Sequence, residues 1–170
     1  MKIFKKNQNG FTLVELLLYI ALASVMLAVV SGFLGTILNA RVKNQTIAEV
    51  TQQGQRIMSV MTQAIRNAEA INSPATSTSA ALLDLDVIEV ANDPTIFDLS
   101  AGVLRITEGA SAAVDMTSSR VVISDLQFDN LSRTDTAGSI KIQFTISHIN
   151  PAGNNQYEYS KIFYGAASIR

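Results

Sequence analysis

The chain has 170 residues, of which 48 % are hydrophobic, 16 % are charged and none is cysteine, and its formal net charge is −1. The near-neutral charge argues against a high-affinity site for nucleic acid or another polyanion, and the missing thiols exclude disulfides, thiolate catalysis and cysteine-ligated metals. The length is sufficient for one domain with its own core and one long appendage.

The first ten residues are basic and polar, and a long apolar run follows them. Lys2, Lys5 and Lys6 precede the run from Phe11 to Leu38, whose single formal charge is Glu15. The run exceeds the apolar region of a cleaved secretory signal, about 7–15 residues, and is long enough to span a membrane, which takes about 20 residues. The lysines would hold its N-terminus on the cytoplasmic side. A plain anchor leaves Glu15 unexplained, because a charge at membrane depth costs about 2.5–3.5 kcal/mol on insertion scales.

The residues from Lys5 to Leu16 read KKNQNGFTLVEL, with a glycine directly before an aromatic residue and the apolar run directly after. This segment resembles the processing site of type IV prepilins and type II secretion pseudopilins. The resemblance implies cleavage between Gly10 and Phe11 by a membrane-embedded prepilin peptidase and methyltransferase, with N-methylation of the new amine on Phe11. A glycine suits a scissile position because a backbone without a β-carbon enters a protease cleft easily in an extended form.

Removal of the leader would create a partner of opposite charge for Glu15. Phe11 then carries a positive α-amine, and Glu15 lies four residues on, one helical turn away. The two charges can pair within one subunit, or Glu15 can reach the amine of a neighbouring subunit, so that docking into a filament removes the penalty of an unpaired carboxylate. The resemblance implies the same assembly role for Glu15. The alternative is a carboxylate that reaches the lipid headgroups from the start of the helix.

Helical periodicity continues from Ala40 to Ile71 and defines one apolar face, on which only Gln53 intrudes. We therefore predict one helix from about Thr12 to Ile71, since no proline occurs before Pro74. Gly54 lies on the apolar side. Because glycine has no side chain, this position predicts that a sheet or another helix approaches the helix closely there. The stripe is too wide and irregular for a strict coiled coil. The apolar face comprises Ile47, Val50, Gly54, Ile57, Met58, Val60, Met61, Ile65, Ala68 and Ile71.

Downstream of Pro74 the chain alternates apolar and polar residues and is rich in β-branched side chains, which predicts strands joined by turns. The segment from Arg120 to Leu131 is expected to break near Asp125. One antiparallel sheet packed on the amphipathic half-helix would bury both apolar faces, and the resemblance implies the same α+β, type IV pilin-like fold. The predicted strands cover residues 85–90, 96–99, 102–107, 114–116, 120–131, 139–149 and 156–169.

These boundaries predict four parts: a leader over 1–10, a membrane and filament-core helix over 11–38, the amphipathic half of the same helix over 39–73, and a β-rich headpiece over 74–170. The sequence shows no evident catalytic or metal-binding pattern. His148 is the only histidine and falls at a strand end, where a structural role is favoured over a catalytic one. The acidic residues Asp84, Asp86, Asp93 and Asp98 form no calcium-loop pattern. We expect no enzymatic activity, metal or cofactor.

The expected function is that of a structural subunit of a type IV pilus or a type II secretion pseudopilus. The stretch from Gln52 to Ala68 resembles minor pilins of the J and W sort. The implied partners are the prepilin peptidase and methyltransferase, other pilin subunits, an inner-membrane platform protein, an assembly ATPase, and membrane lipid before assembly. The implied location is the cytoplasmic membrane, with the headpiece outside, and then the filament. The alternative is a membrane-anchored binding or enzymatic domain that keeps its leader.

Overall fold

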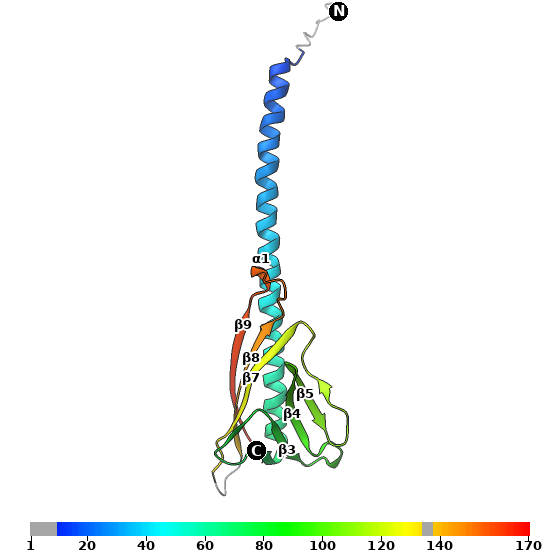
Figure 1. Ribbon diagram of the computed structural model, residues 1–170, viewed down its shortest axis with the longest axis vertical. Helices are drawn as coiled ribbons and strands as arrows, with labels where there is room; N and C mark the ends of the chain where they lie inside the picture. The colour runs from blue at the N-terminus through cyan, green and yellow to red at the C-terminus, as the bar shows by residue number, and fades with distance from the viewer. Residues whose placement is uncertain (1–9, 134–137) are drawn as a thin grey trace, which may run out of the picture. The chain divides into compact units, whose positions relative to one another are not determined.

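The computed structural model describes residues 10–133 and 138–170, and the chain divides into two compact units between Arg41 and Val42. One helix contributes to both units, and the strands belong to the second (Figure 1). The elements in chain order are α1 (Leu13–Asn67), β1 (Ala68–Ser73), β2 (Ser79–Ala80), β3 (Leu83–Val87), η1 (Val90–Asn92), β4 (Thr95–Ser100), β5 (Val103–Glu108), β6 (Val114–Asp115), β7 (Val121–Asn130), β8 (Ser139–His148), η2 (Asn155–Tyr157) and β9 (Ser160–Ser168).

In the first unit, α1 is apolar all round. Every described residue from Gly10 to Arg41 is exposed, and an 18-residue window of the helix reaches a mean hydropathy of 2.5 with none of its residues buried. At 1.5 Å per residue, 20 residues of such a helix cover the roughly 30 Å of a bilayer core. This part of the chain is therefore long and apolar enough to cross a membrane.

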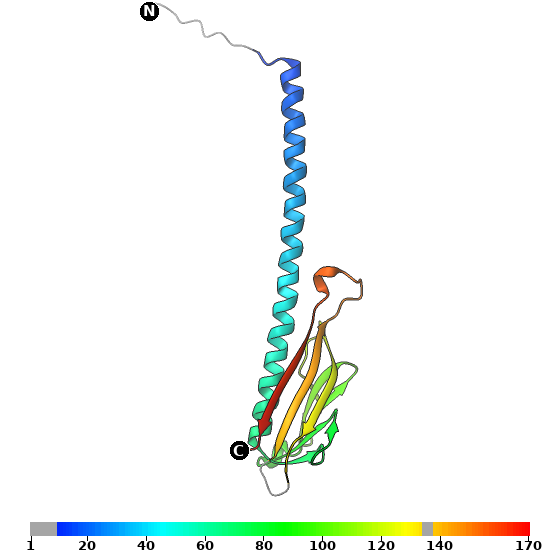
Figure 2. The same cartoon turned by 90° about the vertical axis from the view of Figure 1, so that its left-hand side faces the viewer.

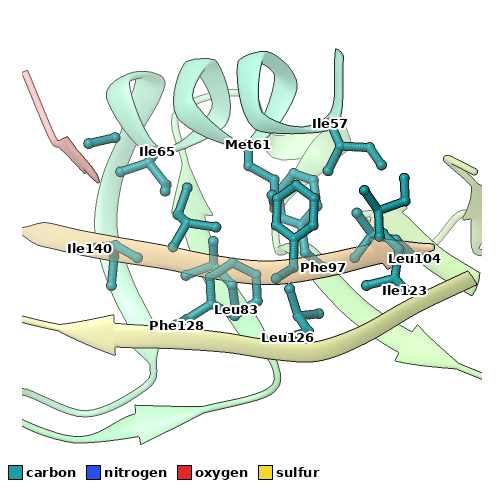
Figure 3. Close-up of a cluster of buried hydrophobic side chains, with 14 of the residues drawn as sticks. Ile57, Met61, Ile65, Leu83, Phe97, Leu104, Ile123, Leu126, Phe128 and Ile140 are labelled. Atoms are coloured by element: carbon teal, nitrogen blue, oxygen red, sulfur yellow. The ribbon is translucent and has the colours of Figure 1, made fainter. Parts of the chain in front are cut away.

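In the second unit, which we call the headpiece, α1 buries one face. Val50, Ile57, Met61 and Ile65 are almost fully buried against the sheets, and Figure 3 shows Ile57, Met61 and Ile65 pointing from α1 toward Phe97, Leu104, Ile123 and Ile140. This confirms the predicted apolar face. The intruding Gln53 has a structural partner, because its Nε2 donates to Ser118 Oγ at 2.6 Å and its Oε1 accepts from the Ser118 N–H at 3.1 Å.

The helix ends at Asn67, four residues before the predicted Ile71. Residues Ala68–Ser73 form β1, whose backbone pairs with β3 in antiparallel fashion, with Ala68 opposite Val87. Ala68 is buried all the same, so the spacing of apolar residues was compatible with both structures. The pairing with β3 decided the outcome, because it supplies the backbone hydrogen bonds that another helical turn would have supplied.

The strands form two antiparallel sheets, whereas the sequence predicts one. The first sheet has the order β1-β3-β4-β5-β6, and the second has the order β2-β7-β8-β9. The two-residue β2 pairs with β7, so the chain passes through the second sheet between β1 and β3. Alternation of apolar and polar residues identifies a strand, but it does not identify the strand beside it. One core of apolar side chains lies between α1 and both sheets.

The predicted break near Asp125 is confirmed as an irregularity within β7. Asp125 has a φ of +53°, and the register with β8 shifts between Ser124 and Gln127. Aspartate tolerates the left-handed region better than most residues. A bulge of this kind bends the strand and increases its twist.

The last strand, β9, lies beside α1 (Figure 2), and the two elements make two reciprocal contacts. A β-carbon on Gly54 would lie 2.2 Å from the ring of Phe163, and a β-carbon on Gly165 would lie 2.4 Å from the sulfur of Met58. Each glycine thus makes room for a large side chain from the other element. The Phe163 ring also stacks on Phe144 of β8, with centroids 5.3 Å apart. The close approach predicted at Gly54 is confirmed.

Asp129 on β7 is the centre of a polar cluster that joins β2, β7 and β8. Its carboxylate accepts hydrogen bonds from Ser79 Oγ at 2.6 Å, Gln127 Nε2 at 2.6 Å and Lys141 Nζ at 3.1 Å. These bonds, led by that from Ser79, lower the pKa of Asp129 to about 2, because each of them favours the charged carboxylate.

We expect Asp129→Asn to reduce the acid sensitivity of the headpiece. Aspartate in an unfolded chain titrates near 3.9, so the depressed pKa stabilises the fold above about pH 4, and this stabilisation is lost as the pH falls toward about 2. The measurement is the unfolding temperature of the detergent-solubilised protein between pH 6 and pH 2 (a range set by those two pKa values). The variant should lose less stability over this range than the wild type. Asp86→Asn, which removes a carboxylate elsewhere on the headpiece, is the control, and equal slopes for wild type and Asp129→Asn would contradict the prediction.

Candidate functional site

The site predicted from the sequence lies at the N-terminal end of the described chain. Gly10 and Phe11 precede α1, and both are exposed, Phe11 by 71 %. A β-carbon on Gly10 would meet no other described atom within 4 Å. Packing against the described residues therefore does not require a glycine at position 10. The leader lysines Lys2, Lys5 and Lys6 lie outside the described residues.

Thr12 caps the start of α1. Its Oγ1 accepts a hydrogen bond from the backbone N–H of Glu15 at 3.3 Å, and its carbonyl accepts the N–H of Leu16 at 3.1 Å. The bond from the Glu15 N–H satisfies a donor of the first helical turn that has no partner within the helix. The bond from the Leu16 N–H is the first backbone hydrogen bond of the helix itself. Glu15 lies in that first turn, where the helix dipole favours a negative charge. The helix thus begins at Leu13, and two residues separate its start from the predicted cleavage bond.

Glu15 is placed in a short stripe with two aromatic residues. Tyr19 Oη donates a hydrogen bond to Glu15 Oε1 at 3.4 Å, and the Phe11 and Tyr19 rings meet edge to face with centroids 5.8 Å apart. Phe11, Glu15 and Tyr19 are spaced four residues apart, so they share one side of the helix. The structure therefore brings Glu15 and Phe11, two of the predicted site residues, together on one side of the chain's N-terminal end.

Sequence reasoning missed Thr12 and Tyr19 as parts of this site. A signal for Thr12 was present, because Thr-x-x-Glu before an apolar run is the pattern of a capping box. The Glu15 carboxylate contacts the Tyr19 hydroxyl, whereas a capping box would direct it back to the backbone N–H of Thr12. The signal for Tyr19 was its position one turn beyond Glu15, where a phenol can satisfy a carboxylate in apolar surroundings.

Three of the residues considered for chemistry elsewhere, His148, Asp93 and Asp98, have structural partners. His148 has an 11 % exposed side chain, its Nδ1 lies 2.9 Å from the carbonyl oxygen of Ile149, and its ring stacks on Tyr157. Among the predicted loop acids, Asp93 accepts the N–H of Val87 and Asp98 pairs with Arg105. In residues 10–133 and 138–170, no three histidine or acidic side chains are grouped so as to hold a metal ion.

Comparison with known families is informative for the N-terminal segment. Residues 5–31 match the model of the prokaryotic N-terminal methylation motif. Searches of curated proteins and of solved structures gave no match. The matched residues cover the predicted leader end, the cleavage position and most of the apolar helix, and behind them stands one long helix packed on antiparallel sheets, as in type IV pilins. Both observations support the placement of this chain in the type IV prepilin and pseudopilin family, as a precursor with a prepilin-type N-terminus.

Proposed function

We propose that this protein is a structural subunit of a type IV pilus or a type II secretion pseudopilus. In this proposal the peptide bond between Gly10 and Phe11 is hydrolysed, the new amine of Phe11 receives one methyl group, and the subunit enters a helical filament through its apolar helix. The resemblance to the J and W sort favours a minor pilin. The chain itself contributes no catalysis, because the peptidase, the methyltransferase and the assembly ATPase are separate proteins.

The observation that carries the proposal is the apolar part of α1 headed by the methylation motif. Every described side chain from Gly10 to Arg41 is exposed, and in this segment the large apolar side chains are continuous. An apolar surface of this size needs a cover. Lipid supplies that cover before assembly, and the helices of neighbouring subunits supply it afterwards. We propose a single membrane crossing with the leader in the cytoplasm and the headpiece outside.

Glu15 provides the register for assembly in this proposal. The Tyr19 hydroxyl offers one hydrogen bond to the carboxylate, which leaves its charge unneutralised. The methylated amine of Phe11, on the same or a neighbouring subunit, supplies the opposite charge after cleavage. A charge pair away from water is strongly favoured over either unpaired partner. Assembly is then coupled to maturation, because the amine does not exist until the leader is removed.

The first test is the mass of the protein extracted from membranes that contain the processing enzymes. We expect the mass of residues 11–170 plus one methyl group, located on Phe11 by fragmentation. Gly10→Val should slow leader removal roughly a hundredfold, because a branched side chain at the scissile position displaces the reacting bond from the catalytic groups. Gly35→Val, the same substitution inside the apolar helix, is the matched control and should be processed normally. An intact Met1 in the wild-type protein would contradict the proposal and favour an uncleaved anchor.

A further inference from the structure

Two grooves flank the exposed ridge of α1 in the headpiece, and their charges are opposite. The basic groove, of about 530 Å³, runs between α1 and β9, and its charged residues are Arg66 and Arg170. The acidic groove, of about 430 Å³, lies on the other side of the helix, and its charged residues are Glu89 and Glu108. Gln63 and Asn67 line both grooves, so only one ridge of the helix separates them. In Figure 1, β9 and the β4–β5 pair lie on the two flanks of this part of α1.

The basic groove has an apolar wall and an open strand edge. Met58 and Phe163 contribute apolar side chains to it, and β9 is the last strand of its sheet, so its outer edge pairs with no other described strand. Natural proteins rarely leave a long apolar edge strand uncovered, because unpaired backbone groups attract other chains. A segment that covers this edge and carries negative charge would match the groove.

The turn that leads into the acidic groove has the complementary properties. Ile88 and Val90 are exposed by 74 % and 85 %, more than any other large apolar side chain described in the headpiece, and Glu89 lies exposed between them. We call residues 88–92 the η1 lip. Two hydrogen bonds shape the lip and its base: the N–H of Asn92 donates to the Glu89 carbonyl at 2.8 Å, and the N–H of Val87 donates to the Asp93 carboxylate at 3.3 Å. A preformed lip loses little conformational entropy when it binds.

We propose that the basic groove of one copy of this chain binds the η1 lip of a second copy. Ile88 and Val90 would cover the wall formed by Met58 and Phe163, and Glu89 would face Arg66 and Arg170. A groove of about 530 Å³ lies in the range that accommodates small ligands, roughly 300–1,000 Å³, and it is therefore large enough for such side chains. The inference rests on the proposed function and adds the surface through which headpieces of adjacent subunits meet.

The two surfaces fit the repeating contacts of a filament. The basic groove and the η1 lip are different surfaces of one headpiece, so the contact joins unlike surfaces. In the helical filament of the proposed function, neighbouring subunits are related by a rotation and a rise, so the contact repeats head to tail and leaves one basic groove and one η1 lip free at the ends. The headpieces would thus add a polar, specific contact to the apolar contact of the helices.

The absence of cysteine from the chain makes site-directed cross-linking a clean test. Full-length protein with Val90→Cys and Ser59→Cys, one on the η1 lip and one in the basic groove, is treated in membranes or sheared filaments with a short bismaleimide. We expect a ladder of cross-linked species at multiples of the subunit mass, with peptides that join positions 90 and 59. Each single-cysteine variant should give dimers at most. Val114→Cys, at an exposed apolar position on β6, replaces Val90→Cys in the matched control and should give no ladder.

Charge reversal in the same two-cysteine background tests the electrostatic part. Arg66→Glu and Glu89→Arg should each reduce the ladder about tenfold, because like charges then face each other across the contact. The combined variant, which exchanges the two charges, should recover the ladder to within about twofold. Reduction in both single variants without recovery in the combined variant would overturn the proposed pairing of Glu89 with Arg66.

The cross-linked ladder and the removal of the leader are measured separately, so that the headpiece contact and the proposed function can fail independently. A processed, methylated chain that gives no ladder overturns the headpiece contact and leaves the proposed function intact. An unprocessed chain that gives a ladder supports the contact and contradicts the proposed function, and an unprocessed chain without a ladder overturns both. A Val90→Cys cross-link only to a protein of another mass overturns the second copy as the occupant and assigns the η1 lip to a different subunit.

Discussion

Replacing Glu15 by valine should leave leader removal and membrane insertion intact and reduce incorporation of the subunit into filaments roughly a hundredfold. Removing one partner of a buried charge pair typically costs about 3–5 kcal/mol, because the remaining charge has no partner. In Glu15→Val that remaining charge is the amine of Phe11. Insertion into lipid should be unaffected or easier, since the substitution removes the formal charge of the apolar run. The measurement is the ratio of processed subunit in sheared filaments to processed subunit in the membrane.

A second variant distinguishes the presence of the carboxylate from its position relative to Phe11. The variant with Glu15→Val and Leu18→Glu keeps the net charge but places the carboxylate seven residues from Phe11. If the pairing requires the spacing seen here, this variant should assemble as poorly as Glu15→Val alone. Tyr19→Phe, which removes only the hydrogen bond to Glu15, should assemble within about tenfold of the wild type, because one such bond contributes about 0.5–1.5 kcal/mol. Normal assembly of Glu15→Val would refute the pairing.

The largest effect on stability is expected for Gly54→Val. The added β-carbon would lie 2.2 Å from two atoms of the Phe163 ring, and that ring is held by its stacking on Phe144. The clash is relieved only if β9 moves away from α1, so we expect the free energy of unfolding to fall by about 3 kcal/mol. For a headpiece of this size that lowers the unfolding temperature by about 10 °C. Thermal unfolding of the detergent-solubilised full chain, followed by near-ultraviolet circular dichroism, measures the change.

Gly35→Val is the matched control for this effect. It makes the same substitution in the same helix, at a position where an added β-carbon meets no described atom within 4 Å, and it should change the headpiece transition very little. Phe163→Ala should recover part of the loss when added to Gly54→Val, because the two side chains then no longer collide. An unchanged unfolding temperature in Gly54→Val would show that β9 does not approach α1 as closely as described.

The elements with a strong local signal could be predicted from the sequence. The apolar face of α1 follows from spacing alone, and the close approach at Gly54 follows from the one residue on that face without a side chain. The break at Asp125 was detectable because the alternation of β7 changes there. The end of α1 could not be predicted, because Ala68 fits the apolar face of a longer helix and is also buried in the strand that it forms. The partition into two sheets depends on contacts between residues far apart in the chain, such as Ser79 with Asp129, and alternation carries no information on them.

At the candidate site, too, features set by local spacing could be predicted, and features set by side-chain direction or by contacts between distant residues could not. The position of Glu15 one turn after Phe11 follows from helical spacing, and the motif match over residues 5–31 agrees with the predicted processing segment. The Tyr19 hydroxyl as a partner of Glu15 depends on side-chain direction, which spacing leaves open. The two charged grooves were beyond reach of the sequence, because Arg66 and Arg170 meet only where β9 lies beside the end of α1.

The reciprocal glycine contacts determine how the headpiece bears mechanical load. From Gly54 to Met58 the helix advances about 6 Å, and from Phe163 to Gly165 the strand advances about 6.6 Å in the same direction, so β9 runs alongside the helix with two strand residues to four helix residues. Tension transmitted along α1 therefore loads the β8–β9 hydrogen bonds, which lie across the strands, in shear. Bonds loaded in shear resist together, whereas bonds that are peeled break one after another. In the proposed filament, a chain without disulfides would thus gain tensile strength from the direction of its last strand.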